Sequence, residues 1–461
     1  MLEKDLQPTN ENIISTFLKD ALDRNNELYN YVTILDEVDK CYSIAIDSYW
    51  GTGKTFFVKQ LKMIYDINND FAYDHFENDE VKKAWSILCN NDDSCAKNYT
   101  SIYYDAWMND NDNDPILSLV YQILITTGTE NTLKDKVDIK NICKIAGDIF
   151  KRQIGFDPNH IINELKGDDP LAIIQKEKSL QEQINDLIDS IIPEHGQRLL
   201  IIVDELDRCN PEFAVRFLER IKHYFTNDKV TFLFSINRVE LLHTIKRFYG
   251  VEFSADRYLD RFFDLTLPLA KPNLSKYLEM FHNVPNNSFI INTNTRLIVE
   301  KFELGARETS RYVQLSKMLI KDQTMEGTQR KALVFINNVV LPVMIALYLT
   351  NHKKYNDFIN GHDNTPFIDF YTSDDSIDNS NYYLKKLYNL DESKNLKNDK
   401  ELLTQKLDQF CKSITSQSNI KEIGEIYISK QDKDYFRKAM SLITERTIKK
   451  QIVQQYNYLY L

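Results

Sequence analysis

The sequence predicts an α/β fold in which helices cover both faces of a parallel sheet, followed by a mostly helical region. Three observations lead to this prediction. Short apolar runs in residues 41–271 alternate with stretches whose apolar residues recur at helical spacing. One run, QRLLIIVDELDRCN at 197–210, has five consecutive apolar residues, as a strand buried on both faces has. After about residue 272 the strand pattern stops. Strands that alternate with helices form parallel sheets.

The elements are expected in the following order. Residues 1–40 carry apolar side chains at helical spacing and predict an N-terminal helical segment. A polar, mostly helical insert is expected at about 128–190, and the Asn/Asp-rich stretch 354–382 is expected to be a long loop. The expected strands are CYSIAI (41–46), SIYYDAW (101–107), the apolar run before Asp204, KVTFLFSIN (229–237) and RFFDLTLPL (261–269).

Composition narrows the class of protein. The net charge of -11 argues against a protein whose main role is non-specific nucleic-acid binding, although it leaves nucleic acid open as a partner. The six cysteines form no C-x-x-C pair, and the N-terminus has no signal-peptide pattern. We therefore expect reduced thiols and a cytoplasmic protein. The eight histidines show no zinc-binding spacing.

One apolar segment, 332–350, is almost long enough to cross a bilayer. Asn337, Asn338 and Pro342 interrupt it, and two amides near its centre would be costly in hydrocarbon. A buried core helix or helical hairpin is therefore favoured over a membrane span.

The stretch IAIDSYWGTGKTFFVKQL, which begins at Ile44, has the features of a phosphate-binding loop. Glycines at 51 and 53 allow main-chain amides to approach a phosphate, Lys54 supplies positive charge, and Thr55 would ligate Mg²⁺. The alternative is a chance strand–turn–helix. The expected nucleotide-binding residues are Ser48, Tyr49, Trp50, Gly51, Thr52, Gly53, Lys54, Thr55 and Phe56. Ser48 occupies the usual first glycine position, where a positive φ would cost serine about 1–2 kcal/mol.

A second signal is the acidic pair Asp204–Glu205 at the end of the apolar run. A carboxylate at the end of a buried strand is costly unless a cation lies nearby. We expect Asp204 to hold Mg²⁺ through water and Glu205 to act as the base for an attacking water. The alternative, acids near a helix N-terminus, accounts better for Asp207 or Asn210 than for Asp204.

Two more polar residues are candidates for the same site. Asn237 ends the fourth expected strand and would position the water, or is simply a turn residue. Arg261 precedes the fifth and would stabilise charge on the γ-phosphate from a neighbouring subunit, or forms a surface ion pair with Asp260 or Asp264. For Trp50 and Trp107, core packing is the favoured role.

Four ordered motifs resemble the KAP family of P-loop NTPases: SYWGTGKTFFVKQL, YYDAWMNDNDNDPILSLVYQIL, IIVDELDRCNPEFAVRFLERI and YLDRFFDLTLPL. The resemblance covers about residues 30–270, and ARETSRYVQLSKML resembles an Arg-containing helix of that family. The sequence departs from the family pattern at Ser48, Asp105 and Glu205. Many members have transmembrane helices in the insert, but the insert here is too polar to span a membrane.

The resemblance implies an ATPase core with sheet order 5-1-4-3-2 and a helical C-terminal region. By position, Lys54 and Thr55 match the phosphate and metal residues, Asp204 and Glu205 the metal and base residues, and Arg208 an Arg of the acidic strand. Arg307, or alternatively Arg311, matches the later helix and would sense the γ-phosphate. The resemblance also raises the expectation that Arg261 acts across an oligomer.

These observations predict three regions: a helical segment at 1–40, a KAP-like NTPase domain at 41–271, and a mostly helical domain at 272–461. The expected function is Mg²⁺-dependent ATP hydrolysis that powers or gates an oligomeric effector, with anti-phage defence suggested by analogy alone. ATP is favoured because no guanine-reading N-K-x-D pattern occurs. The alternative is a nucleotide-gated scaffold with slow turnover that recruits a protein partner through 272–461. DNA translocation or repair is a third hypothesis by fold analogy.

Overall fold

A computed structural model describes residues 7–69, 78–90, 96, 99–112, 114–128, 170–281, 295–321, 331–373, 384, 400–415, 421–423 and 426–443. These residues belong to two compact units, the N-terminal unit at 7–273 and the C-terminal unit from 274 onward. The middle of the expected insert, 129–169, lies outside the described residues.

The N-terminal unit is built on a five-stranded parallel sheet with the order β2-β3-β4-β1-β5. Read from the other edge this is 5-1-4-3-2, so the predicted order is confirmed. The strands are β1 (Tyr42–Asp47), β2 (Tyr99–Asp105), β3 (Arg198–Asp204), β4 (Val230–Ile236) and β5 (Leu265–Pro268). Because all five are parallel, the loops after β1, β3 and β4 meet at one edge of the sheet.

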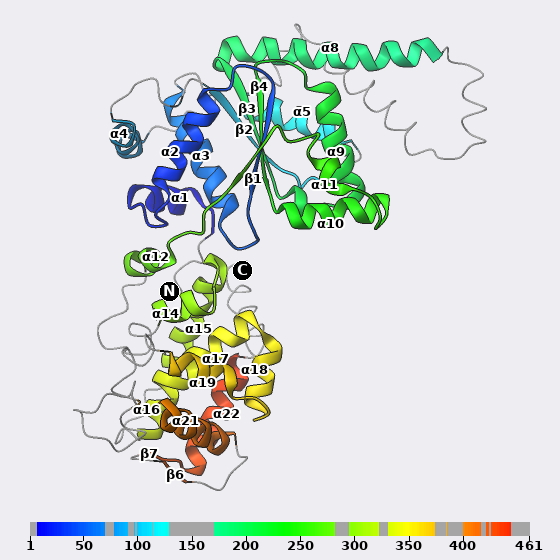
Figure 1. Ribbon diagram of the computed structural model, residues 1–461. Helices are drawn as coiled ribbons and strands as arrows, with labels where there is room; N and C mark the ends of the chain where they lie inside the picture. Colours follow the sequence, from blue (N-terminus) through cyan, green and yellow to red (C-terminus); the bar gives the residue numbers. More distant parts are fainter. Residues whose placement is uncertain are drawn as a thin grey trace, which may run out of the picture. The chain divides into compact units, whose positions relative to one another are not determined.

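Helices lie on both faces of the sheet (Figure 1). On one face α3 packs against the strands, with three helices outside it. These are α1 (Asn10–Leu18), α2 (Asn25–Asp36), α3 (Lys54–Asn68) and α4 (Asp79–Leu88). The other face buries one apolar cluster under the remaining helices. They are α5 (Pro115–Thr126), α8 (Pro170–His195), α9 (Pro211–Tyr224), α10 (Arg238–Tyr249) and α11 (Ala255–Leu259).

Local sequence explains where these helices begin. The side chain of Asp114 accepts the amides of Ile116 and Leu117 at the start of α5, ahead of a first-turn proline. Asn210 caps α9 in the same way and is followed by Pro211. A capping residue followed by a proline thus fixes the start of α9.

The described part of the C-terminal unit is mostly helical, as predicted, but it also contains a strand pair and two helices that the sequence did not predict. The strands form a short antiparallel pair, β6 (Glu422–Ile423) with β7 (Ile426–Tyr427), which is too short to leave a strand pattern. The expectation of a long loop at 354–382 is wrong for its first part, because α18 (His352–Ile359) and α19 (Thr365–Thr372) occupy it. Buried aromatic residues hold these two helices in place despite the Asn/Asp-rich surface. The other helices are α12 (Leu274–Phe281), α14 (Thr295–Lys301), α15 (Ala306–Lys321), α21 (Lys400–Ile414) and α22 (Lys430–Ile443).

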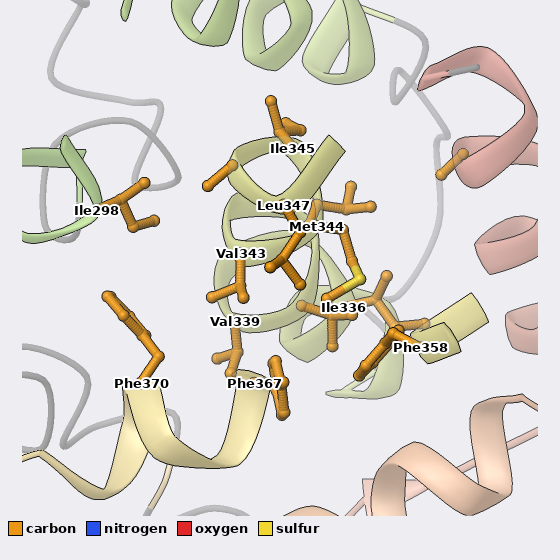
Figure 2. Close-up of a cluster of buried hydrophobic side chains, with 14 of the residues drawn as sticks. Ile298, Ile336, Val339, Val343, Met344, Ile345, Leu347, Phe358, Phe367 and Phe370 are labelled. Atoms are coloured by element: carbon orange, nitrogen blue, oxygen red, sulfur yellow. The ribbon is translucent and has the colours of Figure 1, made fainter. Parts of the chain in front are cut away.

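The apolar segment forms one continuous helix, Lys331–Thr350, in the core of this unit. It is long and apolar enough to cross a membrane, but 78% of its most apolar window is buried. Figure 2 shows apolar side chains of neighbouring helices around it. Such burial is what a core helix requires, which is the alternative that the sequence favoured.

The same helix changes geometry in the middle, from α16 (Lys331–Phe335) through a π-helical turn (Ile336–Val340) to α17 (Leu341–Thr350). Pro342 lacks an N–H, and a proline inside a helix removes an intrahelical hydrogen bond. Other side chains bond to this turn: the Tyr371 hydroxyl donates to the carbonyl of Val339 at 2.7 Å, and the Tyr435 hydroxyl to the Asn337 side chain at 2.6 Å. The amide of Asn337 is therefore satisfied inside the protein.

The cysteines do not all match the expectation of reduced thiols. Cys41, Cys209 and Cys411 are free, but Cys89 is disulfide-bonded. Cys89 ends the helical stretch of α4, at the periphery of the N-terminal unit. The prediction of reduced thiols is therefore wrong at this position.

Candidate functional site

The loop between β1 and α3 has the main-chain geometry of an anion-binding turn. Gly51 and Gly53 both have φ of +84°, a conformation that residues with a Cβ adopt only at a cost. The first amide to bond within α3 is that of Phe57, which donates to Gly53 at 3.0 Å. The amides of residues 54–56 therefore lack intrahelical acceptors at the positive end of the helix, as an anion site requires.

Ser48 carries no backbone strain. It is not among the described residues with positive φ, so the penalty considered for serine at this position does not apply. The main-chain amide of Ser48 donates to the carbonyl of Ile236 at 3.1 Å. The Ser48 hydroxyl donates to the carbonyl of Leu269 at 3.4 Å. A hydroxyl at the usual glycine position thus ties the loop to the chain that leaves β5.

Lys54 lies over the loop, where its ammonium donates to the carbonyls of Ser48 at 2.6 Å and Tyr49 at 3.2 Å. Its side chain is mostly buried. Burial lowers the pKa of Lys54, while the neighbouring carboxylates, Asp207 foremost, act in the opposite direction. A lysine in this position supplies positive charge close to the first-turn amides.

The acidic end of β3 lies next to this loop. The hydroxyl of Thr55 donates to Oε1 of Glu205 at 3.2 Å, so the first turn of α3 and the end of β3 are in direct contact. Asp204 is 1% exposed, and its carboxylate accepts the Tyr103 hydroxyl at 2.9 Å and the amide of Glu205 at 3.0 Å. Two donors stabilise this buried carboxylate, one of them from the neighbouring strand β2.

Glu205 is held in an unusual conformation. Its φ is +63° with ψ of 21°, a left-handed geometry that a non-glycine residue rarely adopts. Its Oε2 is paired with Nε of Arg208. Burial, followed by the charge of Asp204, raises the pKa of Glu205 to about 7, although Arg208 opposes the shift.

Asp207 also belongs to the site, although the sequence did not single it out. It is 6% exposed, and its carboxylate accepts the indole Nε1 of Trp50 at 2.6 Å. Burial raises the pKa of Asp207, and the bonds from Trp50 and from the Asn237 main chain lower it. Asp207 therefore joins the loop after β1 to the end of β4. The sequence signal was its place two residues after Glu205, which was assigned to helix capping.

Trp50 and Trp107 do not pack in the core, so that expectation is wrong. Each is 49% exposed. The guanidinium carbon of Arg208 lies 6.0 Å from the ring centroid of Trp50 and 5.7 Å from that of Trp107, within the range of a cation–π contact. Of the other loop residues, Tyr49 is 68% exposed, whereas the side chain of Phe56 is buried.

Arg24 is a second residue that the sequence did not indicate. It lies between α1 and α2, is 3% exposed, and its Nη1 donates to the carbonyl of Thr52 at 2.9 Å. Its Nη2 donates to the carbonyl of Ala270. Burial lowers the pKa of Arg24 to about 10. Because Arg24 and Thr52 are far apart in sequence, only the folded chain reveals this support for the loop.

Of the remaining predicted residues, Asn237 is buried near the site and Arg261 is exposed. Asn237 is 4% exposed beside Asp207, where its side chain also caps α10 by accepting the amide of Glu240 at 3.5 Å. Arg261 is exposed and makes no ion pair with a residue that the structure describes. Asp260 instead pairs with Arg238, and Asp264 lies 3.9 Å from Lys222, so the expected surface pair of Arg261 is not formed.

Arg307 belongs to the C-terminal unit, on α15, and its side chain is exposed. Arg311 is exposed one turn further along the same helix. Residues at i and i+4 share a helix face, so both arginines face the same way.

The residues present fit a hard divalent cation that is also held by phosphate. No group of three or more His, Cys, Asp or Glu side chains suited to a metal occurs within the described ranges. Mg²⁺ does not need such a group, since it usually keeps several waters and binds one or two carboxylates plus substrate phosphates. The hydroxyl of Thr55 and the buried carboxylate of Asp204 offer that kind of oxygen donor.

Comparison with known proteins gives one family. The model of the KAP family P-loop domain matches residues 24–346. No curated protein matches the chain. Among solved structures it is similar to the Aeropyrum Pernix ORC2 protein (ADPNP-ADP complexes), with 14% identity and a TM-score of 0.33 over 92% of this chain and 85% of that chain. The family match spans the glycine loop, the acidic end of β3 and the whole sheet. The chain belongs to the KAP family of P-loop NTPases.

Proposed function

We propose that this protein binds ATP and hydrolyses it with Mg²⁺. The observation that carries the proposal is the 3.2 Å hydrogen bond between Thr55 and Glu205. It joins two motifs that are far apart in sequence, a cationic phosphate loop and a pair of carboxylates. A triphosphate held by the loop would therefore have its terminal phosphate beside an acidic pair.

In this proposal the loop binds and Glu205 performs the proton transfer. The main-chain amides of residues 54–56 and the ammonium of Lys54 bind the phosphates. Thr55 and Asp204 would hold Mg²⁺, which neutralises charge on the phosphates when bound. Glu205 takes a proton from the attacking water, and its raised pKa, about 7, suits a base that works near neutral pH.

Three further residues have proposed roles. Asn237, buried beside Asp207, would orient the attacking water. Arg261 is exposed and lacks an ion-pair partner among the described residues, which leaves its guanidinium available to the site of a neighbouring copy. Arg307 would sense the γ-phosphate from the C-terminal unit. The proposed role of Arg261 requires assembly, because the arginine would act on the site of a neighbouring copy.

Turnover measurements test the enzymatic proposal directly. ATP hydrolysis by the wild type is compared with Lys54→Ala and Glu205→Gln. Lys54→Ala should lose nucleotide binding, whereas Glu205→Gln should still bind and turn over about 10²–10⁴-fold more slowly, the usual contribution of a positioned base. Lys83→Ala, which removes an exposed lysine of α4, is the matched control for loss of a lysine. Equal turnover in all four proteins would reject the proposal.

The use of hydrolysis is a separate proposal. We infer an oligomeric cytoplasmic effector powered or gated by ATP, and by analogy alone a role in anti-phage defence. The alternative is a scaffold that turns over slowly and recruits a partner through the C-terminal unit, which has its own apolar core. Sedimentation with and without ATP tests assembly: a monomer in both conditions counts against the scaffold and against Arg261 acting across subunits.

A further inference from the structure

Both carboxylate oxygens of Glu205 have partners within the protein. Oε1 accepts the hydroxyl of Thr55 at 3.2 Å, and Oε2 is paired with Nε of Arg208. A base must have a free lone pair directed at the water that it deprotonates. The bond from Thr55 is compatible with catalysis, because a hydroxyl that ligates a cation donates its proton elsewhere. Oε2 accepts no hydrogen bond from the described residues, but the Arg208 guanidinium lies against it as an ion pair and so competes with water for this oxygen.

Arg208 is held in place by more than this ion pair. It lies in the turn Leu206–Arg208 directly after β3, with its guanidinium within about 6 Å of the Trp50 and Trp107 rings. Trp107 follows β2 and Trp50 follows β1, and these strands lie on opposite sides of β3 in the sheet. The two rings therefore approach Arg208 from loops on either side of it.

The indoles of Trp50 and Trp107 lie where their contact with Arg208 can change. Trp50 donates to Asp207 at 2.6 Å, so its position depends on the phosphate loop and on the turn that carries Arg208. Both rings are half exposed, and the side chain of Arg208 is 27% exposed. A change in either loop would shift the ring contact without unfolding the core.

We propose that Arg208 is a positioning residue that holds Glu205 in a resting geometry, and that this contact must open before Glu205 can accept a proton from water. The proposal rests on the proposed function of Glu205. Arg208 does not need to touch the substrate for this role. Opening the contact would release Oε2, while the hydrogen bond from Thr55 keeps the carboxylate beside the phosphate loop.

Arg208→Ala tests this proposal, with Arg208→Lys and Trp107→Ala as graded variants. We expect Arg208→Ala to raise ATP turnover roughly 3- to 10-fold above pH 8, with KM unchanged, because a partly exposed ion pair is weak enough to open. Arg208 lowers the pKa of Glu205, so the rise of activity with pH should move to higher pH in Arg208→Ala. Trp107→Ala should give a smaller increase in the same direction, and Arg208→Lys an intermediate one.

The other outcomes are distinguishable. If Glu205→Gln is slow and Arg208→Ala is at least tenfold slower than the wild type, Arg208 acts on the substrate. That result overturns the positioning role of Arg208, whereas the proposed function stands. Unchanged turnover and an unchanged pH profile in Arg208→Ala also overturn the positioning role of Arg208. If Glu205→Gln hydrolyses ATP as fast as the wild type, Glu205 is not the base and both proposals fall. Equal melting temperatures for wild type and Arg208→Ala exclude misfolding as the cause.

Discussion

Nη1 of Arg24 donates a 2.9 Å hydrogen bond to the carbonyl of Thr52, inside the phosphate loop. The same guanidinium binds the carbonyl of Ala270, on the chain that leaves β5 for the C-terminal unit. Together with the bond from Ser48 to Leu269, this links the loop to that chain at two points. These two contacts fix the loop against residues 269–270, which directly follow β5.

Arg24→Ala should weaken nucleotide binding and destabilise the N-terminal unit. It leaves the carbonyl of the buried Thr52 without its donor, and a buried unsatisfied polar group costs about 1–3 kcal/mol. We expect ATP affinity to fall about tenfold, measured by calorimetric titration. Arg296→Ala, which removes an exposed arginine paired with Glu300 at 3.1 Å, is the matched control and should leave affinity unchanged. Wild-type affinity in Arg24→Ala would show that the loop keeps its shape alone.

Hydrolysis should rise with pH through neutrality. The pKa of Glu205 is raised to about 7 by burial and by Asp204, so its ionised, active form becomes dominant only above that pH. We expect kcat to increase about tenfold per pH unit well below pH 7 and to level off above it. Steady-state rates from pH 5.5 to 9 check this. A profile that is flat from pH 5.5 upward would mean an ordinary carboxyl pKa.

Glu205→Gln should also change how stability depends on pH. The folded pKa of about 7 lies above the ordinary carboxyl value of 4.5, so the folded state binds more protons between these values, and stability falls as pH rises from 4.5 to 7. The shift corresponds to about 3 kcal/mol at most. Glutamine cannot ionise, so Glu205→Gln should be more stable than the wild type at pH 8 and not at pH 4. Denaturant unfolding at both pH values measures this; an identical difference at both would contradict it.

Most of the fold was predictable because it depends on local patterns. The run of five apolar residues before Asp204 has the pattern of a strand buried on both faces, and the order of the strands followed from the family resemblance. The helices α18 and α19 were missed because their polar faces are rich in Asn and Asp, while a few buried aromatic residues anchor them. The amino-acid composition of a segment averages over both faces of a helix, so a few buried aromatic residues on one face do not show in it.

The site residues that belong to contiguous sequence motifs were predictable. Lys54, Thr55 and Glu205 lie together as the two motifs implied. The residues that support them were not predictable, because Arg24 and Trp50 act through contacts between distant segments. Trp50 was assigned to the core on size alone, yet the ring is half exposed and its Nε1 donates to Asp207.

Trp50→Phe should impair the site more than Trp107→Phe. Both indoles are 49% exposed, and both substitutions keep an aromatic ring near Arg208. Only Trp50 donates to Asp207, and without this bond the pKa of Asp207 should rise further. We expect a fall in ATP affinity of about 1–2 kcal/mol in Trp50→Phe alone, from a hydrogen bond to a charged group. Equal losses in both variants would assign the effect to ring size.

Gly53→Ala and Gly250→Ala separate the role of the loop from backbone strain. Both glycines have positive φ, +84° and +105°, so alanine is strained at each, at a cost of about 1–2 kcal/mol or more. A Cβ at Gly53 would lie 3.5 Å from Nη1 of Arg24, whereas nothing lies within 4 Å at Gly250. We expect both variants to melt at lower temperature but only Gly53→Ala to lose ATP binding, because only its amide faces a phosphate in the proposed complex. If Gly250→Ala lost binding as well, global strain rather than the loop would control nucleotide affinity.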